Sequence, residues 1–323
     1  MMPLRSYCLV FMLVLPSAFG VHAQPYPTRP IRVIVPFVPG GGVDFMGRLV
    51  ARKLNESTGQ PVIVDNRAGA GGTLGSELAA KAAPDGYTLT VNNNSTHGAS
   101  PALYSRLPYD AIRDFSPISV IATAPHILLV PASLPVPSMK DLIELARAKP
   151  GVLNYGSSGT GSQSHLSGEL FKYVTRTSFT HIPYKGAGAS FAALLGGEIQ
   201  VLFSAATGAT PHLKANRLKA LAVTGVERSR FMPEVPTFAE QGVARFEKSP
   251  WYALMGPAKL PPAIVQRLHA EIVRMVADPE VAKIIASVGA DPVGGTPAEC
   301  ATAVRNEIEL WTQLVKVAGI RVE

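Results

Sequence analysis

The sequence predicts an α/β protein of two domains, each a doubly wound sheet with flanking helices. Apolar strand candidates alternate with helical patterns from residue 31 onward, a spacing typical of parallel sheets. Roughly 300 residues follow a short leader, more than one hydrophobic core usually holds. Proline-containing joints at 124–125 and 249–250 interrupt the pattern twice. We therefore expect one domain from residues 24–124 plus 250–323, a second from residues 125–249, and two hinge crossings between them.

The first 23 residues have the features of a cleavable secretory signal peptide. Arg5 precedes an apolar run at 8–15, and the small-residue pattern at 21–23 precedes the expected cleavage near Ala23. The apolar run is much shorter than the roughly 20 residues that a membrane span needs. We expect an exported chain in which Cys300 is the one remaining cysteine, so that no internal disulfide can form.

The composition supports a globular core and argues against a nucleic-acid partner. Hydrophobic residues make up 47% of the chain. The formal charge of +7 becomes +6 when Arg5 leaves with the leader, and the Lys and Arg residues are scattered rather than clustered. A basic balance weakly favours small anionic ligands through long-range attraction, although it serves solubility equally well.

The first strand candidate, residues 31–35, runs into a loop that contains Gly40, Gly41 and Gly42, and a helical pattern opens at Val43. Consecutive glycines let the backbone approach a guest closely, and the start of a helix presents unpaired N–H groups and a positive dipole end. This arrangement suits an anion, although an ordinary tight turn would have the same sequence.

The order of strand, loop and helix recurs along the chain. In the first domain, strands at 61–66 and 87–91 end in the loops 67–72 and 92–97, and a helix covers 73–83. In the second, strands are expected at 127–130, 152–155, 179–182, 199–203 and 218–223, helices from 138 and at 165–174, and polar glycine loops at 156–164 and 183–188. The tail at 261–317 is mostly helical in pattern. Because ligands lie beyond the carboxyl ends of such strands, loops of both domains would face one cleft, and two hinge crossings favour a clamshell that closes around a solute.

Six runs of residues, in order over nearly the whole mature chain, resemble the Bug family of periplasmic solute-binding proteins, the TctC-like receptors of tripartite tricarboxylate transporters. The runs are 35–44, 64–72, 83–87, 153–159, 181–186 and 211–214. The resemblance implies a periplasmic, two-domain receptor that binds a small carboxylate without a cofactor and without chemistry. It implies a di- or tricarboxylate or an aromatic acid as the ligand, and integral membrane permease subunits as partners. We expect a monomer.

The resemblance also implies ligand-binding positions, because such receptors hold a carboxylate with backbone N–H groups, hydroxyls and water from the cleft loops. They are Val38, Gly40, Gly41, Gly42, Val43 and Asp44; Ser95, Thr96 and His97; Ser157, Ser158, Gly159, Thr160, Ser162 and Ser164; and Tyr184, Lys185, Gly186 and Ser204. One position departs from the pattern, since many members carry Asp where this chain has Ser204. Without that carboxylate a ligand ammonium loses an acceptor, so we expect a preference for acids that lack an amino group.

Four acidic or polar candidates near the first glycine loop have a structural alternative that we prefer. Asp44 stands near a helix start, where an acidic side chain usually caps free N–H groups and where it would repel an anion. Asp65, Asn66 and Arg67 suit a hydrogen-bond network that fixes a loop, with the arginine as a multiple donor.

The aromatic and basic candidates are more evenly balanced. His97 and His165 could each lend a donor or a pH dependence, but a structural histidine is the commoner outcome. Tyr184 and Lys185 are the best candidates for side-chain selectivity, although Lys185 suits a solvated position equally well. Trp251 could wall the ligand, and packing in the core is preferred.

Two other functions stay open at this point. A hydrolase is suggested by Ser157, Ser158 and His165, but the loop lacks the Gly-x-Ser-x-Gly elbow, and no orienting acid is apparent. The histidines lack metal-ligand spacing, so no metal site is expected. A sensor that docks on a membrane kinase when loaded would have the same sequence as a transport receptor, because both depend on ligand-driven closure.

Overall fold

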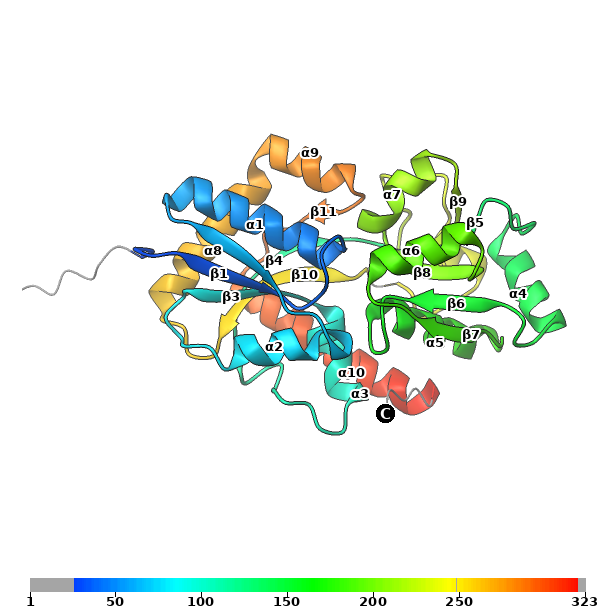
Figure 1. The fold of residues 1–323 in the computed structure, drawn as a ribbon, viewed down its shortest axis with the longest axis horizontal. Coiled ribbons are helices and arrows are strands. Elements are labelled where there is room, and N and C mark those ends of the chain that lie inside the picture. The colour runs from blue at the N-terminus through cyan, green and yellow to red at the C-terminus, as the bar shows by residue number, and fades with distance from the viewer. Residues whose placement is uncertain (1–25, 248, 319–323) are drawn as a thin grey trace, which may run out of the picture.

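The computed structural model describes residues 26–247 and 249–318 as two domains lying side by side, each with its own sheet (Figure 1). The predicted signal peptide at 1–23 lies outside the described residues. Within the described ranges, no helix combines the length and the apolar character that crossing a membrane would require.

The sheet of the first domain has the strand order β11-β4-β10-β3-β1-β2. The strands are β1 (Ile31–Val35), β2 (Val62–Asn66), β3 (Thr88–Asn93), β4 (Phe115–Thr123), β10 (Trp251–Pro257) and β11 (Asp291–Pro292). Strand β1 pairs in parallel with β2 and β3, as the alternating pattern predicts. Strand β10 is antiparallel to both neighbours because it returns from the second domain. The helices of this domain are α1 (Gly42–Thr58), α2 (Thr73–Ala80), α3 (Ser100–Leu103), α8 (Pro262–Ala277), α9 (Pro279–Ser287) and α10 (Pro297–Ala318).

The sheet of the second domain has the order β7-β6-β8-β5-β9. The strands are β5 (His126–Pro131), β6 (Asn154–Ser157), β7 (Thr180–Pro183), β8 (Val201–Ala205) and β9 (Leu218–Val223). Strand β6 lies parallel to β7 and β8, whereas β5 is antiparallel to β8 and β9. The helices are α4 (Met139–Ala148), α5 (Gln163–Thr175), α6 (Ala187–Gly196) and α7 (Ala206–Lys214).

The chain crosses between the domains twice, between β4 and β5 and again before β10, at the joints from which the sequence predicts the domain boundaries. The Ala124 N–H donates to the Pro250 carbonyl at 2.9 Å, so the two crossings run together. The Thr224 N–H donates to the His126 carbonyl at 2.9 Å, which ties the start of β5 to the segment after β9. Sequence analysis identified neither β4 nor β10 as a strand.

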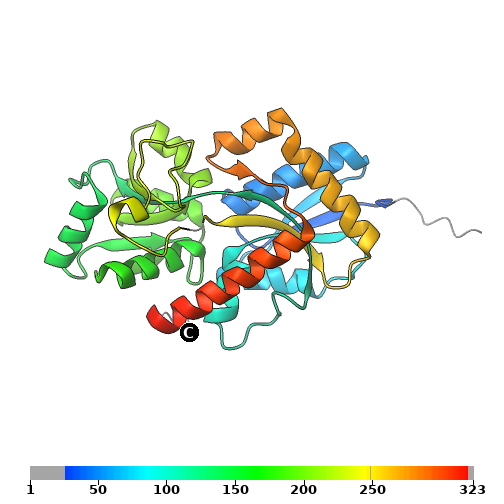
Figure 2. The same ribbon diagram turned by 180° about the vertical axis from the view of Figure 1, so that it is seen from behind.

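The last helix, α10, forms a third link between the domains. It begins beside the first sheet and extends toward the second domain, as the view from behind shows (Figure 2). Trp311 and Leu314 of α10 are buried in one cluster with Leu166 and Leu170 of α5. The helical tail that the sequence predicts therefore contributes to the core of both domains.

Candidate functional site

A cavity of about 90 Å³ lies between the two domains. The first domain contributes Phe37, Val38, Gly41, Gly42, Val43, Asn93 and Tyr252. The second contributes His126, Ser158, Ser162, Gln163, Ser164, Gly186, Ala187, Ser190, Phe203, Ser204, Ala205, Thr207 and Gly208. The volume is enough for roughly six water-sized spheres, which suits a small organic molecule.

Four helices begin at the wall of the cavity. Gly42 is the first residue of α1, Ala187 of α6 and Gln163 of α5, and the beginning of α7 contributes Thr207. The first turn of a helix leaves N–H groups without partners inside the helix, and its dipole favours negative charge. The N-cap residues of α1, α6 and α7 provide no side-chain hydrogen bond. At α7 the Ala206 N–H already donates to the Pro125 carbonyl at 3.0 Å, so there only the later N–H groups of the first turn are open to an acceptor in the cavity.

The walls of the cavity are neutral. Among the described residues that line it, there is no Lys, Arg, Asp or Glu. The polar groups are backbone amides, hydroxyls, two amide side chains and the imidazole of His126. Such a lining offers hydrogen-bond donors to an anion without placing a fixed positive charge beside it.

The two domains approach closely where α1 begins. A Cβ added at Gly42 would lie 2.2 Å from the Tyr252 Oη of the first domain and 2.7 Å from the Thr207 Oγ1 of the second. Only a residue without a side chain fits there. The Thr207 hydroxyl oxygen is buried, and among the described residues its one polar side-chain neighbour is Tyr252, so a ligand in the cavity could serve as a further partner.

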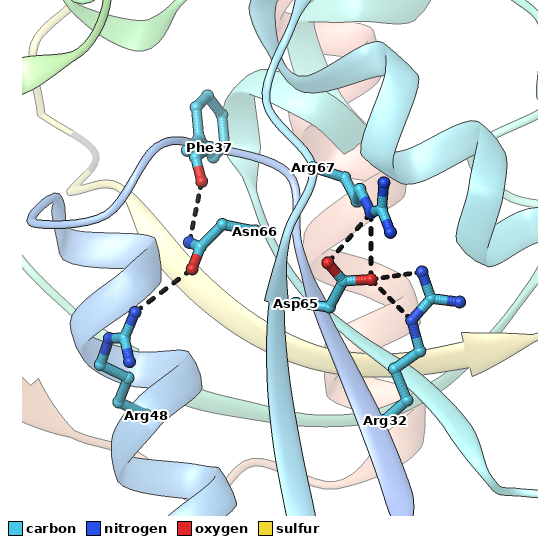
Figure 3. A network of polar contacts seen from close by, with 6 residues as sticks. All are labelled: Arg32, Phe37, Arg48, Asp65, Asn66 and Arg67. Carbon is cyan, nitrogen blue, oxygen red and sulfur yellow. Dashed lines mark hydrogen bonds and ion pairs between the residues drawn. The ribbon is translucent and has the colours of Figure 1, made fainter.

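The glycine loop after β1 is held in place by side chains from β2 and α1 (Figure 3). Asn66 Nδ2 donates to the Phe37 carbonyl at 3.0 Å, and Arg48 Nη2 donates to Asn66 Oδ1 at 3.2 Å. Asp65 pairs with Arg32 and with Arg67 on the neighbouring strand and loop. These contacts fit the loop-fixing network that the sequence suggests for residues 65–67.

Asp44 belongs to the same network and does not line the cavity. Its carboxylate accepts from the Gly40 N–H at 3.0 Å, from Asn66 Nδ2 at 2.8 Å and from Arg48 Nε at 2.9 Å. Burial alone would raise the pKa of Asp44, but the hydrogen bonds from Arg48, Gly40 and Asn66 lower it below its usual range. The carboxylate therefore stays charged and paired outside the cavity. It binds the N–H of Gly40 in the loop, whereas the sequence favoured a cap on the free N–H groups of the helix.

The predicted ligand-binding residues separate into those at the cavity and those elsewhere. The residues at the wall are Val38, Gly41, Gly42, Val43, Ser158, Ser162, Ser164, Gly186 and Ser204. Gly40 lies just outside, with its N–H bound to Asp44. Ser164 is tied to the loop before it, because its Oγ accepts from the Ser158 N–H at 2.9 Å.

Ser95, Thr96 and His97 are fully buried beside the cavity and not within its wall. The loop after β3 winds into a short wide turn over residues 95–99, and this turn directs the side chains inward. Ser95 Oγ donates to the Gly161 carbonyl across the domain boundary at 2.9 Å. Thr96 and His97 are bonded to each other through Oγ1 and Nδ1 at 3.1 Å. The sequence predicts a loop at 92–97, whereas residues 92 and 93 belong to β3 and residues 95–99 form a helical turn.

Gly159, Thr160, Tyr184 and Lys185 line a second, outer groove of about 460 Å³ together with residues 68–72. Val38 and Gly186 line both spaces, and a Cβ at Gly186 would lie 2.2 Å from Val38 Cγ2. Phe37 and Ser158 also line both spaces, so the groove and the cavity are neighbours.

Sequence analysis missed eleven lining residues. They are Phe37, Asn93, His126, Gln163, Ala187, Ser190, Phe203, Ala205, Thr207, Gly208 and Tyr252. Most lie close in the sequence to predicted residues, so a longer stretch around each predicted residue would have included them. His126 and Tyr252 stand at the crossings, directly after the proline joints, and their only sequence signal was that position. Trp251, which was singled out there, packs in the core with 5% of its surface exposed.

The serine that suggested a hydrolase does have a histidine neighbour. Ser157 Oγ lies 2.7 Å from His181 Nε2, and His181 stacks on His165 with ring centroids 4.2 Å apart. Ser157 is fully buried, however, and no carboxylate is bonded to His181. The pair lies behind the wall and not in it. Among residues 26–247 and 249–318, no three His, Cys, Asp or Glu side chains are placed to hold a metal ion.

The chain is similar to several known proteins. Protein BugT of Bordetella pertussis is 38% identical over 315 residues, which cover 97% of each chain. The solved structure of Rhodopseudomonas palustris Rpa4515 with adipate matches with a TM-score of 0.88 and 36% identity, covering 92% of this chain and 99% of that one. That of MatC from the same organism with bound malate matches with a TM-score of 0.85 and 32% identity, covering 90% and 100%.

The model of the family described as "Tripartite tricarboxylate transporter family receptor", TctC, matches residues 46–320. The match includes both sheets apart from β1, and all but the first part of the cavity wall. The chain belongs to this family of solute-binding receptors, the one that its sequence motifs resemble.

Proposed function

We propose that this protein captures a small carboxylate in the cavity between its domains and delivers it to the membrane subunits of a transporter, without catalysing a reaction. The observation that carries the proposal is the convergence of three uncapped helix starts on a cavity without fixed charges. Amides and hydroxyls can hold a carboxylate there while leaving it free to dissociate.

Two relatives support the ligand class. The Rpa4515 structure contains adipate and the MatC structure contains malate, both of them dicarboxylates. The lining of the cavity includes the apolar residues Phe37, Val43 and Phe203 as well as hydroxyl groups. A short carbon skeleton with carboxylate ends would match both kinds of lining group.

Among the described residues of the wall there is no carboxylate, and this bears on which acids the cavity can bind. Ser204, at the position where the family resemblance implies Asp in many members, lines the cavity. A ligand ammonium would find donors but no charged acceptor, so it would lose its hydration without compensation. We therefore propose that the protein prefers acids without an amino group.

Thermal unfolding of the ligand-stripped protein tests the binding role. A panel of di- and tricarboxylates, aromatic acids and acidic amino acids would be compared. A ligand at 100 times its Kd adds roughly 2.7 kcal/mol to the free energy of unfolding, which raises the melting temperature measurably. A shift with one acid class supports the proposal, and no shift with any acid contradicts it.

Titration calorimetry with matched pairs tests the amino-group preference. Aspartate is compared with succinate, and glutamate with glutarate. The proposal predicts tighter binding of the deaminated member of each pair. It fails if either amino acid binds at least about tenfold more tightly than its counterpart, a difference of about 1.4 kcal/mol.

A further inference from the structure

A carboxylate in this cavity would have no lysine or arginine among the described residues of the wall to balance its negative charge. Closure removes water from the acid, and the described lining residues include no lysine or arginine. Hydrogen bonds from amides compensate part of that loss, but a buried anion is held best when a positive charge is also available. The lining residues contain two titratable side chains, His126 and Tyr252, and only an imidazole can become a cation.

The geometry of His126 suits a contact with the ligand. It is the first residue of β5 and only 5% of its surface is exposed. Its Nδ1 lies 3.2 Å from the Ser167 Oγ, so Nε2 is the ring nitrogen left for a ligand. Its backbone is fixed at the crossing, because its N–H donates to Thr224 Oγ1 at 2.9 Å and its carbonyl accepts from the Thr224 N–H.

In the ligand-free cavity this imidazole is neutral. Burial lowers the pKa of His126 to about 3. The charged groups nearby do not favour a proton on the imidazole. Glu169 and Lys172, on the same helix as Ser167, pair with each other. Arg245 and Glu307 line a separate small cavity, to which Ser167 also contributes. The Tyr252 hydroxyl stays protonated, since burial raises its pKa to about 12.

We propose that His126 takes up one proton from solvent when an acid enters the cavity, and that the resulting imidazolium is the counter-charge of the bound carboxylate. The inference rests on the proposed function. An adjacent anion favours the charged form of a histidine and offsets the effect of burial. The Ser167 hydroxyl can accept from Nδ1–H while Nε2–H donates to the acid. Binding and protonation are then linked, so affinity rises as the pH falls.

Calorimetry in buffers of different ionisation enthalpy measures this proton uptake directly. The probes are malate, adipate and succinate, whose carboxyl groups stay largely ionised between about pH 6 and about pH 8. The proposal predicts net proton uptake that grows toward pH 6, and tighter binding there than at pH 8, by no more than tenfold per pH unit. His126→Gln keeps a hydrogen-bonding side chain but should bind independently of pH. His269→Gln, which removes a histidine of α8 outside the cavity, should keep the wild-type response.

Each outcome decides a different claim. Binding of any of these acids without proton uptake by the wild-type protein overturns the role of His126 and leaves the proposed function standing. A pH dependence that persists in His126→Gln also overturns it. If His126→Gln does not fold, the proton uptake of the wild-type protein still decides. Failure of all three acids to bind at both pH values contradicts the proposed function for dicarboxylates and overturns this inference with it.

Discussion

His97 and His126 are both buried histidines, yet they belong to different kinds of surroundings. Burial lowers the pKa of each to about 3. His97 packs in the first domain against Tyr109 and Phe115, with ring centroids 5.8 Å and 4.3 Å away. His126 lines the cavity between the domains. Burial and a lowered pKa therefore do not distinguish a ligand-binding histidine from a structural one. The distinguishing feature is that the side chain lines a cavity.

Removal of the His97 ring should have the largest effect of the changes considered, and it should act on stability alone. His97→Ala leaves a cavity among aromatic rings and removes one of the hydrogen bonds of the Thr96 hydroxyl, which still donates to the Asn93 carbonyl. We expect a loss of about 3 kcal/mol in the free energy of unfolding, measured with denaturant, and an unchanged Kd for the bound acid. A weakened Kd with intact stability would place His97 in the site and break the comparison.

A methyl group at Gly42 should act on binding. Its Cβ would clash with Tyr252 and Thr207 and hold the domains apart. We expect Gly42→Ala to weaken acid binding at least tenfold, about 1.4 kcal/mol, in calorimetry. Gly188→Ala, in α6, is the matched control, because Gly188 does not line the cavity and a Cβ there meets nothing within 4 Å. Equal effects of the two changes would contradict closure at Gly42.

Acidification should destabilise the ligand-free protein through both histidines. The unfolded chain binds their protons below about pH 6.5, whereas the folded protein does not until about pH 3. The free energy of unfolding therefore falls as the pH drops through this range, by up to about 1.4 kcal/mol per pH unit for each histidine. Denaturant titrations at a series of pH values measure this slope. His97→Gln should reduce the slope in both the free and the bound protein, and His126→Gln only in the free protein.

The smallest expected effect concerns a single hydroxyl of the cavity. Thr207→Val keeps the shape of the side chain but removes a buried hydroxyl whose one polar side-chain neighbour among the described residues is Tyr252. We expect acid binding to weaken by a factor of roughly two to ten and stability to change little. Thr210→Val, on the same helix but away from the cavity, should leave the Kd unchanged. A Kd that responds equally to both changes would show that Thr207 does not contact the acid.

The order of elements could be predicted because the local signals are strong. Ser138, for example, accepts from the Asp141 N–H at the start of α4, as their spacing predicts. Strand β4 was missed because Pro117 and Pro125 resemble a linker, although the chain between them is extended and its middle is fully buried.

The glycine loops of the site were also predictable, but the two crossing residues were not. His126 and Tyr252 come together only because two crossing segments, far apart in the sequence, run side by side between the domains. Their position depends on tertiary packing that no local pattern records. The strand order alone would place the side chains of residues 95–97 at the cavity wall, because these residues follow β3. The turn of residues 95–99 buries them beside the cavity instead.

The most direct test of the account is a crystal structure of the protein with the acid that raises its melting temperature most. The account predicts the acid in the cavity, with a carboxylate oxygen within hydrogen-bonding distance of the amides at the start of α1 and of a second-domain helix start. His126 Nε2 would contact the acid as well. An acid bound in the outer groove beside Lys185, or touching only one domain, would contradict it.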